Sequence, residues 1–135
     1  MPNKTFAIIK PDAIENKYMG KIIDKIIENK FDILNARLIT MSKTQAEGFY
    51  AVHKERPFFN DLVSFMCSGP SMVIELKKEN AVAEWRNLIG ATDPDEADEG
   101  TIRRLFAESK ERNSAHGSDS DENAVIEINY FFKNE

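Results

Sequence analysis

One histidine lies in the densest group of small and polar residues in the chain, residues 112–120 with the sequence RNSAHGSDS. The small neighbours of His116 leave room for a substrate to reach its ring. An imidazole titrates near neutral pH, so it can act as a nucleophile or as an acid and base. A surface histidine in a turn-rich segment is the alternative, and the residues alone leave both interpretations open. The other histidine, His53, is interpreted as a solvated helix residue.

Basic residues that could bind an anion stand at predicted element ends or in a long loop: Lys10, Arg86, Arg103 and Arg112. Arginine forks match pairs of phosphate oxygens, and lysine supplies a point charge. Ordinary surface charge is the alternative. The two common glycine-rich phosphate loops are absent, so a nucleotide site would be built from side chains. Phe58 could stack on a base, although phenylalanines at helical spacing are more often core residues.

The composition limits the possible partners. The 135 residues carry 18 basic and 23 acidic side chains, a formal charge of −5, which argues against nucleic acid as the main partner. Residues 1–90 hold 13 bases and 11 acids (+2), and 91–135 hold 5 and 12 (−7). The length predicts a single domain over 1–135. The lone Cys67 excludes an internal disulfide and suits a reducing compartment.

The apolar residues of the chain do not gather in long uninterrupted runs. Its first residues lack a long apolar stretch, and no apolar run approaches about 18 residues, so we expect neither a signal peptide nor a membrane span. We therefore expect a cytoplasmic protein. Two histidines and one cysteine also argue against a structural zinc site, which needs four such ligands.

Hydrophobic spacing predicts the elements that position these residues. Strands are predicted at 5–9, 31–41 and 71–76. Apolar residues at helical spacing predict helices at 18–29, 44–53, 58–66 and 80–89. The segment Ser42-Lys43-Thr44 provides N-cap chemistry for the second helix, and Gly90 ends the fourth. A loop is expected at Lys10-Pro11-Asp12.

The last third of the chain is harder to assign. Residues 90–122 are rich in glycine and charge and are predicted to form a long functional loop. The tail, 124–133, fits both a strand and a helix. Asp119 followed by Glu122 resembles a capping box, which favours the helix. The element order predicts an α+β or α/β sandwich, with helices packed against one small sheet.

Several segments resemble the nucleoside diphosphate kinase family, in family order and over nearly the whole chain. Residues 113–120 (NSAHGSDS) resemble its active-site signature, and residues 7–13 its first strand and lysine. Residues 56–59 and 66–70 resemble its middle signatures, and residues 90–94 and 100–103 resemble its nucleotide-loop segments. The chain departs from the pattern at Glu99, at Lys77-Lys78 and at Asn16-Lys17, which affects loop rigidity and subunit contacts.

The resemblance implies a fold and a reaction. The fold is a ferredoxin-like βαββαβ sandwich, an α+β fold with an antiparallel sheet covered by helices. The reaction is the ping-pong transfer of a γ-phosphate from a nucleoside triphosphate to a nucleoside diphosphate, through a phosphohistidine on His116. Mg²⁺ enters with the nucleotide phosphates, and Asp119 reaches it through water. Members of the family form homo-oligomers, often tetramers or hexamers.

The resemblance also implies roles for individual residues. Glu127 accepts a hydrogen bond from the second imidazole nitrogen of His116, with help from Ser118, and so fixes the tautomer. Tyr50 lies near the phosphate path. The nucleotide is bound by Lys10, Phe58, Leu62, Arg86, Thr92, Arg103 and Asn113.

Two other functions compete with the kinase. One is a non-catalytic nucleotide-binding or regulatory module on the same fold, because a fold does not fix a function. The other is an acidic interaction domain with no ligand, which would leave the match at 113–120 to chance. The presence of the whole expected residue set, nucleophile and carboxylate included, favours the enzyme.

Overall fold

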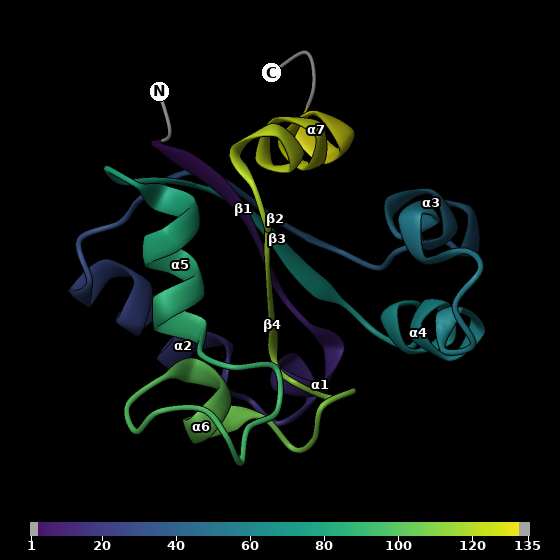
Figure 1. Cartoon of the computed structure of the whole chain (residues 1–135), viewed down its shortest axis with the longest axis horizontal. Helices are drawn as coiled ribbons and strands as arrows, with labels where there is room; N and C mark the ends of the chain where they lie inside the picture. The colour runs from purple at the N-terminus through teal and green to yellow at the C-terminus, as the bar shows by residue number, and fades with distance from the viewer. Residues whose placement is uncertain (1–2, 133–135) are drawn as a thin grey trace.

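A four-stranded antiparallel sheet forms the centre of the computed structural model, which describes residues 3–132 (Figure 1). The strands are β1 (Lys4–Ile9), β2 (Asp32–Ile39), β3 (Ser71–Lys77) and β4 (Ala115–Gly117). Their order across the sheet is β2-β3-β1-β4, and every pair is antiparallel. This arrangement confirms the ferredoxin-like α+β sandwich.

The central strand β1 is buried on both faces of the sheet, which explains why its sequence is almost entirely apolar. Phe6 and Ile8 point to one face of the sheet, and Ala7 and Ile9 to the other, with none of the four exposed. A strand covered on both faces buries successive side chains, so an uninterrupted apolar run suits it.

One face of the sheet is covered by α1 (Pro11–Glu15), α2 (Met19–Glu28), α5 (Ala81–Ile89) and α6 (Ile102–Phe106), as Figure 1 shows. Buried side chains from these helices pack on Ala7 and Ile9, with Trp85 of α5 as the largest of them. This core fixes α5 against β1 and β4.

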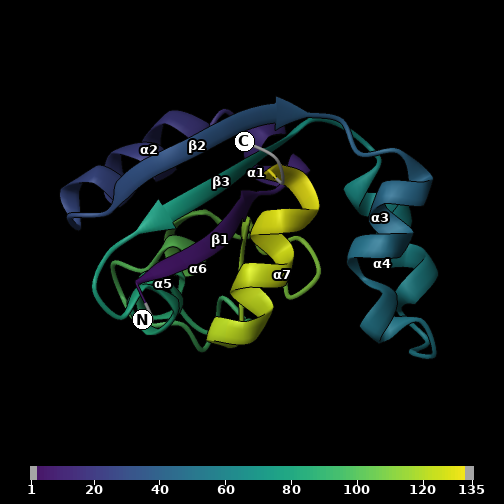
Figure 2. The ribbon, with the colours of Figure 1, turned by 90° about the horizontal axis from the view of Figure 1, so that it is seen from above.

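The other face is covered by α7 (Asp121–Phe132), α3 (Lys43–Phe49) and α4 (Phe59–Met66). Phe6 and Ile8 belong to the core on this side, together with Tyr50, Val63 and Phe132. Figures 1 and 2 show α3 and α4 side by side at one end of the sheet, beyond α7. We call residues 43–66 the α3–α4 lobe.

Most predicted elements are confirmed, with changes at their ends. The strand at 31–41 is β2, and the helices at 18–29, 58–66 and 80–89 are α2, α4 and α5. The helix predicted at 44–53 ends at Phe49 and is followed by a 3-10 turn over Ala51–His53. The N-cap predicted at Ser42-Lys43-Thr44 is confirmed and is Ser42, whose hydroxyl accepts the backbone N–H of Gln45 in a capping box. Gly90 follows α5 as predicted, with φ of 89°.

Two predictions about loops are wrong. The segment after β1 is not a loop but the start of α1, since Pro11 takes the first helical position, where its missing N–H costs nothing. Residues 90–122 are not one loop, because they contain α6 and β4. A strand of three residues is too short to show a periodic pattern, which is why the hydrophobic spacing missed it.

The tail is helical, as predicted, although its cap differs and residue 133 lies outside the described residues. Ser120, rather than Asp119, supplies the cap, because its hydroxyl accepts the backbone N–H of Asn123. Asp119 instead accepts the side-chain amide of Asn123. In the part of the chain that the structure describes, no helix has the length and apolarity to cross a membrane.

Candidate active site

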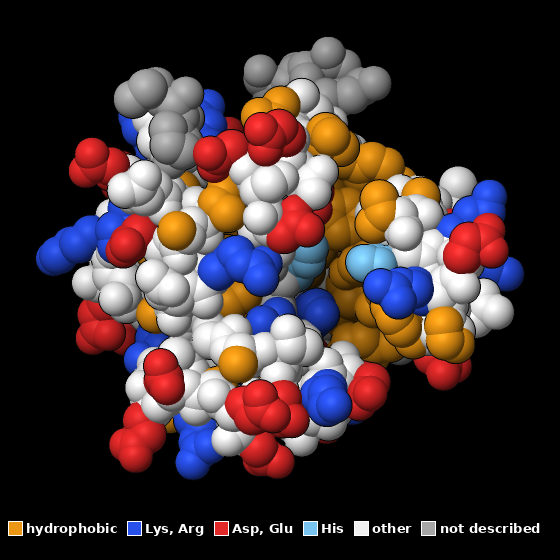
Figure 3. Space-filling view, in the orientation of Figure 1, with side chains coloured by type: hydrophobic (Ala, Val, Ile, Leu, Met, Phe, Trp, Pro, Cys, Tyr) orange, Lys and Arg blue, Asp and Glu red, His pale blue; other side chains and the backbone are white. Residues whose placement is uncertain are grey.

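Strand β4 places His116 on the side of the sheet that faces α7. His116 pairs with Ile8 of β1, so its ring joins the aromatic side chains on that face. The ring centroids of Phe49, Phe6 and Tyr50 lie 5.3, 6.1 and 6.5 Å from that of His116. Figure 3 shows histidine side chains in pale blue on the viewer's face, beside lysine and arginine side chains and an orange hydrophobic area that continues toward the α3–α4 lobe.

The backbone of His116 is held from the opposite face of the sheet. Trp85 donates its Nε1–H to the carbonyl of His116 at 2.9 Å, and the indole is fully buried. The next residue has no room for a side chain, because a Cβ on Gly117 would lie 2.7 Å from Cδ1 of Trp85. The close approach of α5 therefore requires glycine after the histidine.

The side chain of His116 is oriented by the last helix. Its Nε2 lies 2.9 Å from Oε1 of Glu127, and Ser118 donates its hydroxyl to the same oxygen at 2.7 Å. The pKa of His116 is lowered, chiefly by burial, although Glu127 acts to raise it. A neutral imidazole that donates from Nε2 leaves a lone pair on Nδ1, the state that a nucleophile needs.

A lysine and an asparagine meet next to the strand end that carries His116. Lys10, directly after β1, donates its Nζ to Oδ1 of Asn113 at 2.9 Å. Both residues are buried. Burial, with a contribution from the charge of Arg103, lowers the pKa of Lys10 to about 8. The ammonium is therefore a desolvated positive charge, and such a charge binds an anion more strongly than one in water.

Arg103 binds three backbone carbonyls with its guanidinium. Its Nη1 donates to Gly90, its Nη2 to Ala115 and its Nε to Asn113, at 3.0, 2.8 and 3.4 Å. Burial lowers the pKa of Arg103 to about 10, with a smaller contribution from the charge of Arg86. Arg103 thus joins α6, the end of α5 and β4, besides adding positive charge beside Lys10.

A series of rings connects His116 to the predicted base-stacking residue. The ring of Tyr50 lies 6.5 Å from that of His53, which lies 5.5 Å from that of Phe58. Phe58 is 45% exposed, and Leu62 is partly buried one turn along α4. The α3–α4 lobe therefore presents an aromatic face that is open to a ligand.

The hydroxyl of Tyr50 is buried and, among residues 3–132, has no hydrogen-bond partner. Burial raises its pKa, and the charge of Glu127 adds to that shift. Tyr50 is thus a neutral donor close to His116, and a bound oxygen atom would satisfy its hydroxyl.

Three predicted residues lie at the edge of this arrangement. Arg86, Thr92 and Asp119 are exposed. Arg86 and Asp119 line a hollow of about 620 Å³ between α5 and the start of α7. In the described part of the chain, Thr92 makes no hydrogen bond to the residues around His116.

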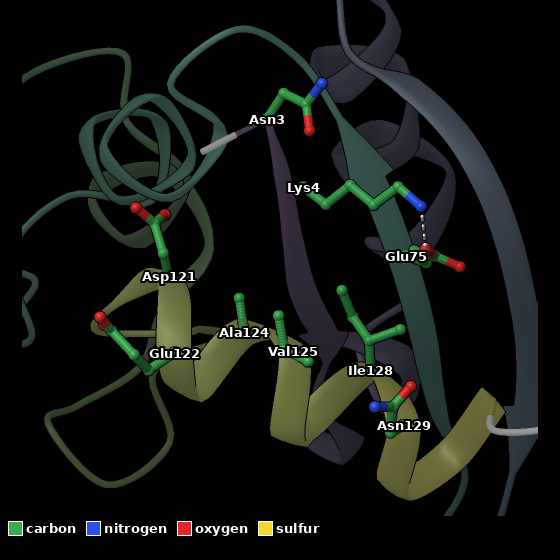
Figure 4. Close-up of a pocket in the computed structure, with 9 residues that line it drawn as sticks. All are labelled: Asn3, Lys4, Glu75, Asp121, Glu122, Ala124, Val125, Ile128 and Asn129. Atoms are coloured by element: carbon green, nitrogen blue, oxygen red, sulfur yellow. Dashed lines mark ion pairs between the residues drawn. The ribbon is translucent and has the colours of Figure 1, made fainter. Parts of the chain in front are cut away.

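A second hollow, of about 500 Å³, lies between β1 and α7 (Figure 4). Lys4 and Glu75 form an ion pair of 3.5 Å within it. Its lining contains none of the predicted site residues. The residues around His116 thus form a separate site.

The sequence interpretation missed three residues of this site. Trp85 looked like an ordinary residue on the apolar face of a helix, and His53 like a solvated one, although it is only partly exposed and lies between aromatic rings. Asp12 is fully buried and accepts the backbone N–H of Ser114. A carboxylate three residues after a buried strand was the local signal for Asp12.

Taken together, the site offers a neutral imidazole with a carboxylate behind it, and positive charge supplied by Lys10 and Arg103. Such a set can accept and release a phosphoryl group, because phosphoryl transfer needs mainly positioning and neutralisation of charge. Among residues 3–132, no three or more histidine, cysteine or acidic side chains come together in a way that could hold a metal ion.

Comparison with known proteins agrees with this chemistry. The family described as "Nucleoside diphosphate kinase" matches residues 3–135. A nucleoside diphosphate kinase of Trichlorobacter lovleyi is 60% identical over 129 residues, 96% of this chain and 94% of that protein. Another, of Lawsonia intracellularis, is 57% identical over 128 residues, 95% of this chain and 93% of its own length.

Solved structures give the same result. The nucleoside diphosphate kinase of Aquifex aeolicus superposes with a TM-score of 0.96 at 41% identity, covering 98% of this chain and 96% of that one. A halophilic nucleoside diphosphate kinase from Halobacterium salinarum, solved in complex with CDP, gives 0.94 at 31% identity, covering 99% and 90%. By sequence and by fold, the chain belongs to the nucleoside diphosphate kinase family.

Proposed function

We propose that this enzyme transfers the γ-phosphate of a nucleoside triphosphate to a nucleoside diphosphate by a ping-pong reaction on His116. The observation that carries the proposal is the 2.9 Å contact between Nε2 of His116 and Glu127, which leaves Nδ1 free to attack. The lowered pKa of His116 supports it, since the ring is neutral at physiological pH. The non-catalytic alternative is not favoured, because the relatives that cover nearly the whole chain are kinases.

In the first half-reaction, the lone pair on Nδ1 attacks the γ-phosphorus in line with the bridging oxygen. A P–N bond forms, the P–O bond to the β-phosphate breaks, and the nucleoside diphosphate leaves with that electron pair. Glu127 stabilises the positive charge that the phosphorylated ring acquires, while the Nε2 proton stays on the ring. The second half-reaction reverses these steps on an acceptor diphosphate.

The binding roles follow from charge and exposure. Lys10, Arg86 and Arg103 would neutralise the phosphate oxygens, with Thr92 as a further donor. Lys10 and Asn113, already in contact, would bind the ribose 3′-hydroxyl. Phe58 would stack on the base with Leu62 beside it, and stacking on a π-face suits every base. The CDP complex of the Halobacterium relative supports a nucleotide in this fold.

Magnesium belongs to the substrate in this proposal. It arrives on the nucleotide phosphates and neutralises charge that develops on them. Asp119 is the carboxylate that would reach it through water. This fits the chain, because Asp119 is exposed and shares a hollow with Arg86.

We also propose that residues 1–135 form one domain and that the protein assembles as a homo-oligomer, a tetramer or a hexamer. Strand β2 supports assembly, since it is an edge of the sheet and exposes Leu34 and Leu38, and an open edge strand tends to pair with another chain. Light scattering with sedimentation would measure the assembly. The lone Cys67 supports our proposal that the protein works in the reducing cytoplasm.

The decisive experiment is a phosphoenzyme assay. Incubation with Mg²⁺ and [γ-³²P]ATP should leave a label on the protein that is labile in acid and stable in base. His116→Ala should abolish the label, whereas His53→Ala, which removes the other histidine, should still acquire label. A wild-type protein that binds nucleotide but never acquires label would establish the non-catalytic module instead.

A further inference from the structure

A buried aspartate accepts a hydrogen bond from the backbone of the segment that precedes His116. Asp12, the second residue of α1, is fully buried, and its Oδ2 accepts the backbone N–H of Ser114 at 3.0 Å. Its Oδ1 is also buried and, within residues 3–132, has no hydrogen-bond partner. Burial of a carboxylate costs free energy, so an interaction in the folded protein must offset that cost.

The contact belongs to a clamp between the end of β1 and the start of β4. Lys10 donates its backbone N–H to the carbonyl of Ser114, and its Nζ to the side chain of Asn113, both at 2.9 Å. With the Asp12 contact, three hydrogen bonds join residues 10–12 to residues 113–114. These bonds fix Asn113 and Ser114, directly before Ala115 and His116.

The clamp acts on a strained residue. Ser114 has φ of 71°, a left-handed conformation that costs about 1 kcal/mol or more for a residue other than glycine. Hydrogen bonds on both its N–H and its carbonyl hold it there. Without the Asp12 acceptor, the N–H of Ser114 would be buried and unpaired, and the turn into β4 would lose its support.

The clamp also brings the Asp12 carboxylate beside Lys10, because both side chains are buried and they bind the adjacent residues Ser114 and Asn113. Burial and the charge of Arg103 on α6 favour loss of the Lys10 proton, and Asp12 opposes both. The pair also acts on two other charged groups. The charge of Lys10 contributes to the lowered pKa of His116 on β4, and the charge of Asp12 contributes to the raised pKa of Arg112. Within residues 3–132, Asp12 is thus the acidic group that raises the pKa of Lys10, against the effects of burial and of Arg103.

We propose that Asp12 is a positioning residue, whose carboxylate fixes the Asn113–His116 segment through Ser114 and places a negative charge beside the Lys10 ammonium that binds the nucleotide. The second part rests on the proposed role of Lys10. An asparagine could still accept the N–H of Ser114, but it carries no charge. The two functions of the carboxylate are therefore separable by substitution.

The test compares Asp12→Asn with Asp24→Asn, the same change at an exposed aspartate on α2. The basic limb of the pH profile of kcat/KM should move toward acid by about one pH unit in Asp12→Asn, as expected when an opposite charge is removed, and should stay in place in Asp24→Asn. If Lys10→Met abolishes the basic limb and Asp12→Asn leaves it unmoved, the charge role is overturned, whatever happens to the rate.

A direct titration separates this proposal from the role of Lys10. In protein with ¹⁵N-labelled lysine, the Nζ resonance of Lys10, assigned with Lys10→Met, should titrate at lower pH in Asp12→Asn than in the wild type. This shift is expected even if Lys10→Met leaves KM unchanged, an outcome that would contradict only the nucleotide role of Lys10. Equal titration in the two proteins would overturn the proposal.

The unmutated chain provides a test that does not depend on the variant folding. The Ser114 amide proton should change its chemical shift with the titration of the Asp12 carboxyl, whose pKa burial raises above its ordinary value. An amide proton that does not respond would overturn the clamp.

Discussion

The Nε2 atom of His116 lies 2.9 Å from Oε1 of Glu127, so the last helix of the chain orients the imidazole that the fourth strand carries. Neither element could do this alone. The strand supplies a fixed backbone through Trp85, and the helix supplies the carboxylate that selects the tautomer.

Replacing Glu127 by glutamine should lower kcat by about 10²-fold, because the amide no longer stabilises a positively charged phosphoimidazole. Glu127 raises the pKa of His116, so its loss should also move the acidic limb of the pH profile to lower pH. Single-turnover phosphorylation across pH measures both effects. Glu122→Gln, an exposed position on the same helix, is the matched control, and an equal loss there would contradict the assignment.

The pH profile of the activity should have an acidic limb set by His116 and a basic limb set by Lys10. It should fall at low pH as His116 takes up a proton, with a midpoint below the ordinary 6.5, because burial favours the neutral ring. It should fall again near pH 8 as Lys10 loses its proton. The measurement is kcat/KM for MgATP from pH 5 to 10. A basic limb that persists unchanged in Lys10→Met would exclude Lys10 as its source.

Trp85→Phe should destabilise the protein by about 1–3 kcal/mol, since the carbonyl of His116 loses its donor inside the core. Gly117→Ala should cost about 1–3 kcal/mol by forcing a methyl group against the indole. Urea denaturation measures both. The double variant should be less destabilised than the sum of the two, because phenylalanine makes room for the methyl group; strict additivity would argue against the contact.

Tyr130→Phe should weaken the attachment of the α3–α4 lobe to α7. Tyr130 donates its hydroxyl to the carbonyl of Gln45 at 2.8 Å, and its loss should cost about 1 kcal/mol. Because Phe58 lies on this lobe, the KM for nucleotides should rise more than kcat falls. Tyr18→Phe, on the other side of the sheet, is the control. A fall in kcat alone would contradict this role for Tyr130.

Much of the fold is readable in the sequence. The apolar residues of β1 and the helical spacing of α2, α4 and α5 each span enough residues for a period to show, and these elements were predicted with small errors at their ends. The local motif at 113–120 identified the histidine and the family, because a run of specific residue types needs no knowledge of the fold.

Tertiary structure decided the rest. The three residues of β4 are a strand only because they pair with Ala7, Ile8 and Ile9, and no local pattern encodes that register. The same pairing brings Asp12 to Ser114, 102 residues away along the chain, and places Trp85 behind the histidine. The sequence thus determined which residues carry the chemistry. The support that Asp12 and Trp85 give them depends on contacts between distant segments, which only the folded sheet brings together.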